Sequence, residues 1–182
     1  VDVMLNTQVM NCDENGLTLK DGTVIPTKTV IWAAGVKAVP FIAAMGFETD
    51  RSGRVIVNEK LQIKDHPEIF AIGDCANFQH GTERPLPTVA PVATQQAVVC
   101  QENVMKLIRG KQDLQTFAYK DLGAMATIGR GDAVMCQGSL KMKGFFAWCA
   151  WMVVHLMRLA GTHTNITVAL KWIWNLVSGT RL

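Results

Sequence analysis

The fold of this chain is organised around one short stretch, Ile69-Phe70-Ala71-Ile72-Gly73-Asp74-Cys75-Ala76. Four apolar residues followed by a Gly-Asp pair predict a buried strand that delivers one carboxylate to its C-terminal end. Open α/β sheets bind their ligands at that end of their strands. Gly73 lets a ligand approach the backbone, and the Asp74 carboxylate can accept a hydrogen bond from a sugar or sugar-alcohol hydroxyl. An ordinary Gly-Asp turn fits the same letters, so the neighbouring motifs have to decide.

Three further motifs accompany this stretch. Residues 29–35, Thr-Val-Ile-Trp-Ala-Ala-Gly, predict a second buried strand that ends in small residues, with Trp32 in the core. Residues 53–57 predict an alternating strand. Residues 88–97, Thr-Val-Ala-Pro-Val-Ala-Thr-Gln-Gln-Ala, predict the start of a helix, because proline is tolerated in the first turn and not later. Thr88 is a candidate N-cap for this helix, and Gly110 supplies its C-terminal stop.

The order of these motifs resembles the C-terminal half of FAD-dependent pyridine-nucleotide oxidoreductases. The letters of residues 90–97 are similar to the quinone-site motif of type II NADH:quinone oxidoreductases, A-Q-x-A-x-Q-Q-G. The resemblance runs from about residue 15 to the end of the chain. It implies an α/β fold, as a fragment of a two-dinucleotide-binding-domain flavoprotein with a small β-layer and C-terminal amphipathic helices.

The resemblance also implies a division into three parts. Residues 1–31 would be the tail of the NAD(P)H-binding domain, and residues 32–111 the C-terminal part of the FAD-binding domain. Residues 112–182 would hold the β-layer and helices for membrane docking or dimerisation. The chain lacks an initiator Met and the G-x-G-x-x-G fingerprint, which the family carries once for FAD and once for NADH, so we expect a fragment of a longer protein.

The same family pattern assigns roles to the motif residues. Free backbone N–H groups after the proline of the helix would face the flavin, whose reduced form carries negative charge; a helix N-terminus stabilises such charge by roughly 0.3–1 kcal/mol. The implied FAD-binding residues are Gly35, Gly73, Asp74, Ala90, Pro91 and Val92.

One glutamine falls at the acceptor position of the motif. Gln95 is the implied catalytic residue, because an uncharged amide can donate a hydrogen bond to a quinone carbonyl in an apolar slot. For Gln96, exposure to solvent is an equally good interpretation. The chain departs from the family pattern at two positions, where Pro91 replaces the first Gln and Ala97 replaces the Gly.

Flanking segments complete the predicted architecture. Residues 3–31 predict short strands in hairpins around an Asp21-Gly22 turn, and a turn is predicted at His66-Pro67. Residues 117–140 predict further strands, at 117–119, 124–129 and 133–136. Two apolar helices follow, within 144–160 and 166–177.

The two helices are too short or too interrupted to span a bilayer, which takes about 20 apolar residues. Trp172 and Trp174 beside Lys171 and Arg181 are typical of a helix that lies in the headgroup layer of a membrane. Burial in a core and contact in a homodimer are the alternatives for these helices.

The distribution of charge favours one kind of binding partner, and the cysteine content argues against disulfide bonds and a metal site. Residues 1–132 hold 13 Lys and Arg against 15 Asp and Glu, whereas residues 133–182 hold five cations and no acid. This favours an anionic membrane surface over nucleic acid, because the cations are sparse and lie between aliphatic runs. Five widely spaced cysteines without a C-x-x-C pair predict neither a disulfide framework nor a metal site.

The resemblance therefore implies part of a peripheral membrane flavoenzyme on the cytoplasmic face, with FAD as cofactor. It would pass electrons from NADH through FAD to a quinone, without proton pumping. Two alternatives stay open: a flavoprotein like sulfide:quinone reductase, and a non-catalytic module for membrane docking or dimerisation.

Overall fold

The computed structural model describes residues 2–33, 35–159 and 161–178 of the 182-residue chain. Ala34, in the predicted strand at 29–35, and Arg181, one of the predicted membrane-facing cations, lie outside the described residues. The same holds for the side chains of Leu176 and Val177, at the end of the second predicted apolar helix.

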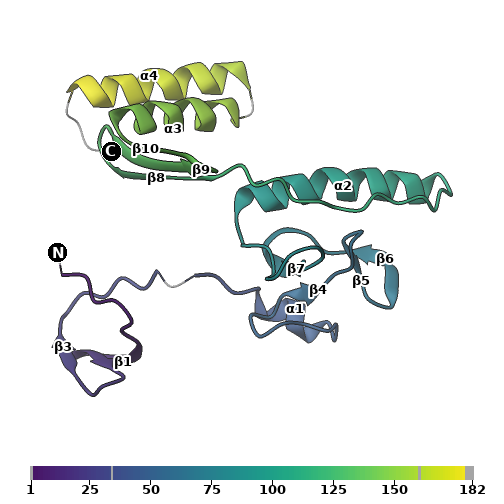
Figure 1. The fold of residues 1–182 in the computed structure, drawn as a ribbon, viewed down its shortest axis with the longest axis horizontal. Helices are drawn as coiled ribbons and strands as arrows, with labels where there is room; N and C mark the ends of the chain where they lie inside the picture. The colour runs from purple at the N-terminus through teal and green to yellow at the C-terminus, as the bar shows by residue number, and fades with distance from the viewer. Residues whose placement is uncertain (1, 34, 160, 179–182) are drawn as a thin grey trace.

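The N-terminal segment forms a small antiparallel sheet in the order β1-β2-β3, with bounds Val9–Asp13, Gly16–Leu19 and Val24–Pro26. The predicted hairpins are confirmed. The turn between β2 and β3 is fixed by Asp21, whose Oδ1 accepts a hydrogen bond from Thr23 N at 2.9 Å. Figure 1 shows this sheet lying apart from the other elements, at the end of an extended connection.

The prediction of a buried strand at residues 29–35 is wrong. The described residues of this segment form no strand, and Ile31 and Trp32 are 88% and 67% exposed. A strand needs a neighbour to pair its backbone N–H and C=O groups, and no described strand lies beside this one. The residues of this apolar run favour a strand, but no neighbouring strand is present within the described ranges to pair with it.

The central unit surrounds one long helix. It comprises α1 (Pro40–Ala44), β4 (Val55–Ile56), β5 (Gln62–Ile63), β6 (His66–Phe70), the 3₁₀ helix η1 (Gly73–Cys75), β7 (Ala76–Asn77) and α2 (Ala90–Ile108). β4 pairs parallel with β7, and β5 pairs antiparallel with β6. Figure 1 shows α2 covering these short strands. The core beneath it is a cluster of buried apolar residues: Val55, Val57, Leu61, Ile63, Ala71, Ala76, Phe78, Leu86, Val92 and Phe117.

Two predicted details of this unit are displaced. The strand before the Gly-Asp pair ends at Phe70 and belongs to a hairpin with β5. The turn of that hairpin precedes His66 and does not include Pro67; it is made at Asp65, which adopts a φ of 63°. Asp tolerates this left-handed conformation better than most residues, so the turn falls two residues earlier than the predicted His66-Pro67 turn.

The ends of α2 lie close to the proline and the glycine that were predicted to mark them. Pro91 lies in the first turn, as predicted, and Gly110, with a φ of 72°, follows the C-cap Arg109. The N-cap is Val89 and makes no side-chain capping bond, so the prediction of Thr88 is wrong. Since proline has no N–H to satisfy, the helix can begin without a polar cap.

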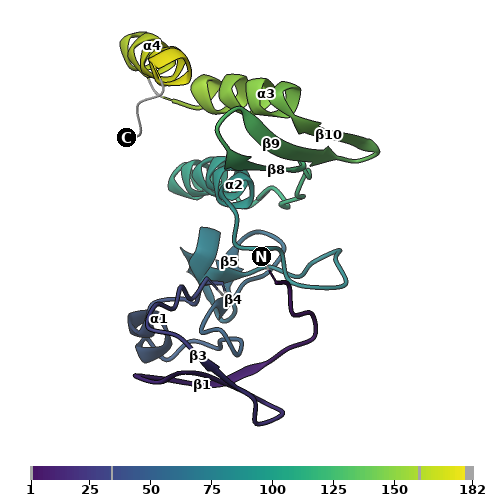
Figure 2. The same ribbon diagram turned by 90° about the vertical axis from the view of Figure 1, so that its left-hand side faces the viewer.

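The C-terminal part is a sheet with two helices. β8 (Ala124–Gly129), β9 (Asp132–Gln137) and β10 (Leu140–Gly144) form an antiparallel sheet in the order β10-β9-β8, followed by α3 (Phe145–Met157) and α4 (Thr162–Ser178). β8 and β9 were predicted and β10 was missed. Figure 2 shows the layers in the order α4, α3, sheet and α2. Within the described ranges, no helix is long and apolar enough to cross a membrane.

Candidate functional site

The Gly73–Asp74 turn lies directly against the beginning of α2. Gly73 adopts a φ of 69°, and a methyl group in place of its hydrogen would lie 3.4 Å from Ala93 Cβ, in the first turns of the helix. Glycine meets both conditions, because it accepts positive φ without strain and leaves room for the helix. The carboxylate motif and the helix start, separated in sequence, are thus adjacent in space.

A buried glutamine amide holds this turn on the helix. Gln96 is 1% exposed, and its Oε1 accepts a hydrogen bond from Gly73 N at 2.7 Å. The alternative that Gln96 faces solvent is therefore wrong. Its burial follows from the helical period, which places Gln96 on the same face as the buried Val92.

The Asp74 side chain is exposed, and no described residue forms a hydrogen bond or an ion pair with its carboxylate. The two neighbouring residues are anchored: Gly73 by Gln96, and Cys75 through a bond from its Sγ to Ile72 O at 3.2 Å. A fixed backbone with a free carboxylate suits the binding of a ligand hydroxyl, because its lone pairs remain available.

The backbone at the start of α2 differs from the prediction. The N–H groups of Val92 and Ala93 both donate to Val89 O, at 3.0 and 3.3 Å, so they are not free to face a ligand. Pro91 has no N–H, and the Ala90 N–H finds no partner in the described part of the chain. The Val92 side chain lies in the core, at 4% exposure. The electrostatic contribution of this helix end therefore rests on Ala90 and on the helix dipole.

Gln95, one residue before the buried glutamine, is bound to a different segment. Its Nε2 donates to Lys120 O and its Oε1 accepts from Lys120 N, each at 3.0 Å. This pair of bonds mimics the pairing of two strands. It leaves one N–H of the amide and one oxygen lone pair for another partner.

Residues 111–123, which we call the strap, run along α2 (Figure 1). The prediction of a strand at 117–119 is wrong, since no strand forms there. Side chains of α2 bind the strap backbone in place of a strand partner. Asn103, with no exposed surface, accepts from Gln115 N at 2.7 Å and donates to Gln115 O at 2.9 Å. Lys106 Nζ donates to Asp113 O at 2.6 Å.

A half-buried ion pair fixes the segment that follows the turn. Asp50 Oδ2 accepts from Arg54 Nε at 2.8 Å and from Asn77 Nδ2, in β7, at 3.0 Å. Arg54 Nη1 also donates to Leu86 O at 3.2 Å. Burial raises the pKa of the Asp50 carboxyl, but the bonds from Arg54 and from Ser52 N outweigh it and hold that pKa below its usual value.

The other predicted site residue, Gly35, lies in the exposed connection after β3. A side chain added there would meet no atom within 4 Å. The structure thus brings together Gly73, Asp74 and the first turns of α2, and does not bring Gly35 to them.

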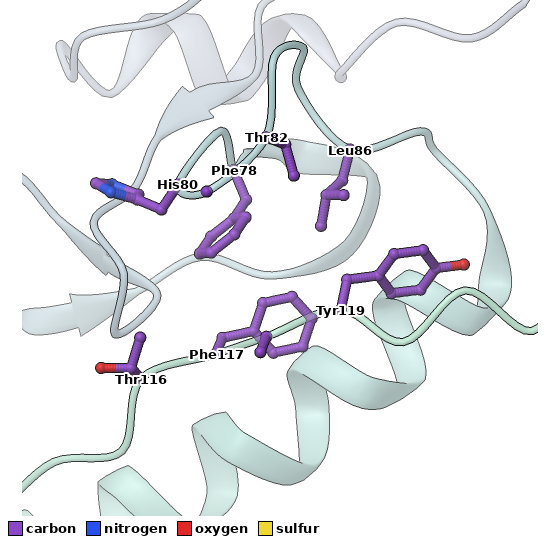
Figure 3. A pocket seen from close by; sticks show the side chains of 9 residues that line it. Phe78, His80, Thr82, Leu86, Thr116, Phe117 and Tyr119 are labelled. Carbon is purple, nitrogen blue, oxygen red and sulfur yellow. The ribbon is translucent and has the colours of Figure 1, made fainter.

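A pocket of ≈ 350 Å³ lies between the loop after β7 and the strap (Figure 3). Its wall is mainly apolar, and the rings of Phe78 and Phe117 meet edge to face with their centroids 5.1 Å apart. It contains none of the predicted site residues; it is lined by Phe78, His80, Gly81, Thr82, Leu86, Thr116, Phe117, Ala118 and Tyr119.

All five cysteines are free thiols, and burial raises the pKa of the Cys100 thiol. In the part of the chain that the structure describes, no three His, Cys, Asp or Glu side chains gather as metal ligands would.

Comparison with known proteins identifies the family of this chain. The model of the pyridine nucleotide-disulphide oxidoreductase family matches residues 1–97, which is more than half of the chain. The chain belongs to this family.

Relatives and solved structures agree with that assignment. Type II NADH:quinone oxidoreductase NdhA of Mycobacterium tuberculosis is 38% identical over 94% of this chain and 38% of its own length. The structure of NDH2 from Plasmodium falciparum in complex with NADH has a TM-score of 0.80 at 17% identity, over 97% of this chain and 51% of that one. Sulfide:quinone oxidoreductase of Aquifex aeolicus has a TM-score of 0.59 at 16% identity, over 96% and 42%. The chain spans about two fifths of the length of the curated relative.

Proposed function

We propose that this chain is part of a flavoenzyme that passes electrons from NADH through FAD to a quinone. The observation that carries the proposal is the contact between the Gly73–Asp74 turn and α2, which presents a free carboxylate beside a helix N-terminus. The 38% identity to a type II NADH:quinone oxidoreductase over nearly the whole chain supports it.

The residues present fit FAD as a ligand. Asp74 would accept a hydrogen bond from a hydroxyl of the ribityl chain, since its carboxylate has no partner among the described side chains and backbone groups. Gly73, Ala90, Pro91 and Val92 would lie beside the cofactor, with the Ala90 N–H, unpaired within the described ranges, as the backbone donor of the helix start. Bound FAD would supply the redox chemistry, accepting a hydride from NADH and returning two electrons to the acceptor.

Gln95 would line the acceptor slot. Two of its hydrogen-bonding positions are held by Lys120, which fixes the direction of the amide, and its remaining N–H would donate to a quinone carbonyl. In this proposal residues 1–31 are the tail of the NAD(P)H-binding domain and residues 32–111 belong to the FAD-binding domain. The acceptor slot would lie between α2 and the β-layer of residues 112–182.

We also propose that α3 and α4 dock the enzyme on the cytoplasmic face of a membrane. The exposed residues Ile166, Leu170, Ile173 and Trp174 recur at helical spacing and form one apolar stripe on α4. The opposite side of α4 packs on α3, with the rings of Trp151 and Trp172 5.3 Å apart. Exposed Lys171 adds positive charge, as interfacial helices commonly do.

The test of the electron-transfer function uses the natural full-length protein. A bound-flavin spectrum that NADH bleaches and a quinone restores supports the proposal. Bleaching by sulfide would favour the sulfide:quinone reductase alternative, and a colourless protein the non-catalytic module.

Within that assay, Gln95→Leu separates the two half-reactions. We expect it to slow reoxidation by quinone about tenfold, the effect of losing one positioned hydrogen bond of about 1.4 kcal/mol. Bleaching by NADH should keep its rate, and equal loss of both rates would contradict the role of Gln95.

A further inference from the structure

We infer that Gln96 is a positioning residue for the cofactor-binding turn, distinct in role from its neighbour Gln95. This inference rests on the proposed binding of FAD at the Gly73–Asp74 turn. It assigns the two adjacent amides to two different tasks.

The contacts of Gln96 carry the inference. The amide is 1% exposed and accepts from Gly73 N at 2.7 Å, across 23 residues of sequence. Gly73 N belongs to the first residue of η1, and Asp74 is the next residue. The bond therefore fixes the backbone from which the Asp74 carboxylate projects. A partly buried N–H that loses its acceptor is destabilising, so this bond helps to hold the turn in its position.

Gln95 points the other way from the same turn of α2. Its amide holds Lys120 in the strap, 25 residues away. α2 thus grips the cofactor-binding turn through one glutamine and the strap through the next. A change at one should leave the other anchored, which makes the two roles separable by experiment.

The test measures FAD affinity and amide hydrogen exchange in the natural full-length protein. In Gln96→Leu we expect the FAD dissociation constant and the exchange rate of amides 72–76 to rise about tenfold or more, because the Gly73 N–H loses its acceptor. Gln96→Glu keeps an acceptor oxygen and should restore most of the exchange protection. Should the Leu variant fail to fold, Gln96→Asn, whose side chain is one methylene too short, is expected to show the same rise.

Two controls separate positioning from general stability. Gln101→Leu lies on the exposed side of α2 and should change neither quantity. Asn103→Leu should lower global stability without raising the FAD dissociation constant. The inference is overturned if Gln96→Leu and Gln96→Asn leave either quantity unchanged, or if FAD affinity falls only in proportion to global stability.

Failure of the inference is distinguishable from failure of the proposed function. A wild-type protein that binds no FAD would remove the function, while exchange at Gly73 would still report on the bond to Gln96. Normal FAD binding in every Gln96 variant would remove the inference alone.

Discussion

The central unit around α2 and the helical pair at the C-terminus use their side chains in opposite ways. In the central unit, polar groups are buried: Gln96 and Asn103 are 1% and 0% exposed, and each binds backbone of a distant segment. In the helical pair, large apolar side chains are exposed, with Leu170 at 63% and Trp174 at 67%.

This contrast separates a site from a surface. Buried, fully directed hydrogen bonds fix where backbone segments lie, which is what a cofactor-binding turn requires. Exposed apolar stripes do not determine where other segments of the chain lie. Covering them with another apolar phase is favourable because it removes apolar surface from water. The side chains of the first region hold segments of the chain itself, and those of the second are available to a partner.

The largest expected effect tests the buried hydrogen bonds of the central unit. Asn103→Leu should destabilise the protein by about 2–4 kcal/mol, because the backbone N–H and C=O of Gln115 both lose a buried partner. Urea denaturation measures the change. Gln101→Leu, on the exposed face of the same helix, is the control and should stay within about 0.5 kcal/mol of wild type.

The exposed apolar stripe of α4 is tested by placing charge on it. We expect Leu170→Glu with Trp174→Glu to weaken binding to vesicles containing anionic lipid at least about tenfold, since apolar burial is lost and repulsion is added. Cosedimentation measures binding. Val98→Glu, a change at a 57% exposed valine of α2, is the matched control.

The same variant decides between a membrane and a second copy of the chain. Analytical ultracentrifugation without lipid would show a dimer in the wild type and a monomer in the double variant if the stripe were a dimer contact. Unchanged vesicle binding in the double variant would contradict membrane docking through this face.

A moderate effect is expected at the ion pair that anchors β7. Asp50→Asn should destabilise the protein at pH 7 by about 1–2 kcal/mol, because a carboxylate with charge-assisted bonds becomes a neutral amide. The pKa of Asp50 is depressed in the folded state, so its contribution is present above pH ~4 and is lost as the pH falls through the folded-state pKa.

Urea midpoints between pH 7 and pH 3 check this dependence. The wild type should lose more stability than Asp50→Asn over that interval, and the two curves should converge at the acid end. Parallel curves would mean that the depressed pKa does not contribute to stability.

The smallest effect concerns the strap. Gln95→Leu should cost about 1 kcal/mol of local stability, since the two bonds to Lys120 are partly solvated. Hydrogen exchange of residues 117–123 should quicken while that of residues 72–76 stays unchanged. Exchange that quickened at both segments would show that the two glutamines do not act separately.

Much of the fold could be predicted from local sequence. The Asp21-Gly22 turn, the start of α2 at Pro91 and its end before Gly110 were all read correctly, because each depends on the backbone preferences of a few neighbouring residues. Residues 29–35 and 117–119 were misread for a common reason. Their letters favour strands, but a strand exists only where another strand is available to pair with it.

The candidate site was predicted in part. The sequence motifs singled out the Gly-Asp turn and the helix start, and these are in contact. The burial of Gln96 and the bonds of Gln95 were not predicted. Helical period alone places Gln96 on the face of Val92, a signal that could have been used, whereas the identity of its partner depends on a segment 23 residues away.

By itself, the sequence determined that α2 has Pro91 in its first turn and ends before Gly110, the order of the motifs and the family to which the chain belongs. These follow from local backbone geometry and from letters in a fixed order. Tertiary structure alone decided which of two adjacent glutamines holds the turn and which holds the strap. A side chain's partner is set by which backbone groups the fold brings within about 3 Å, and no local pattern contains that distance.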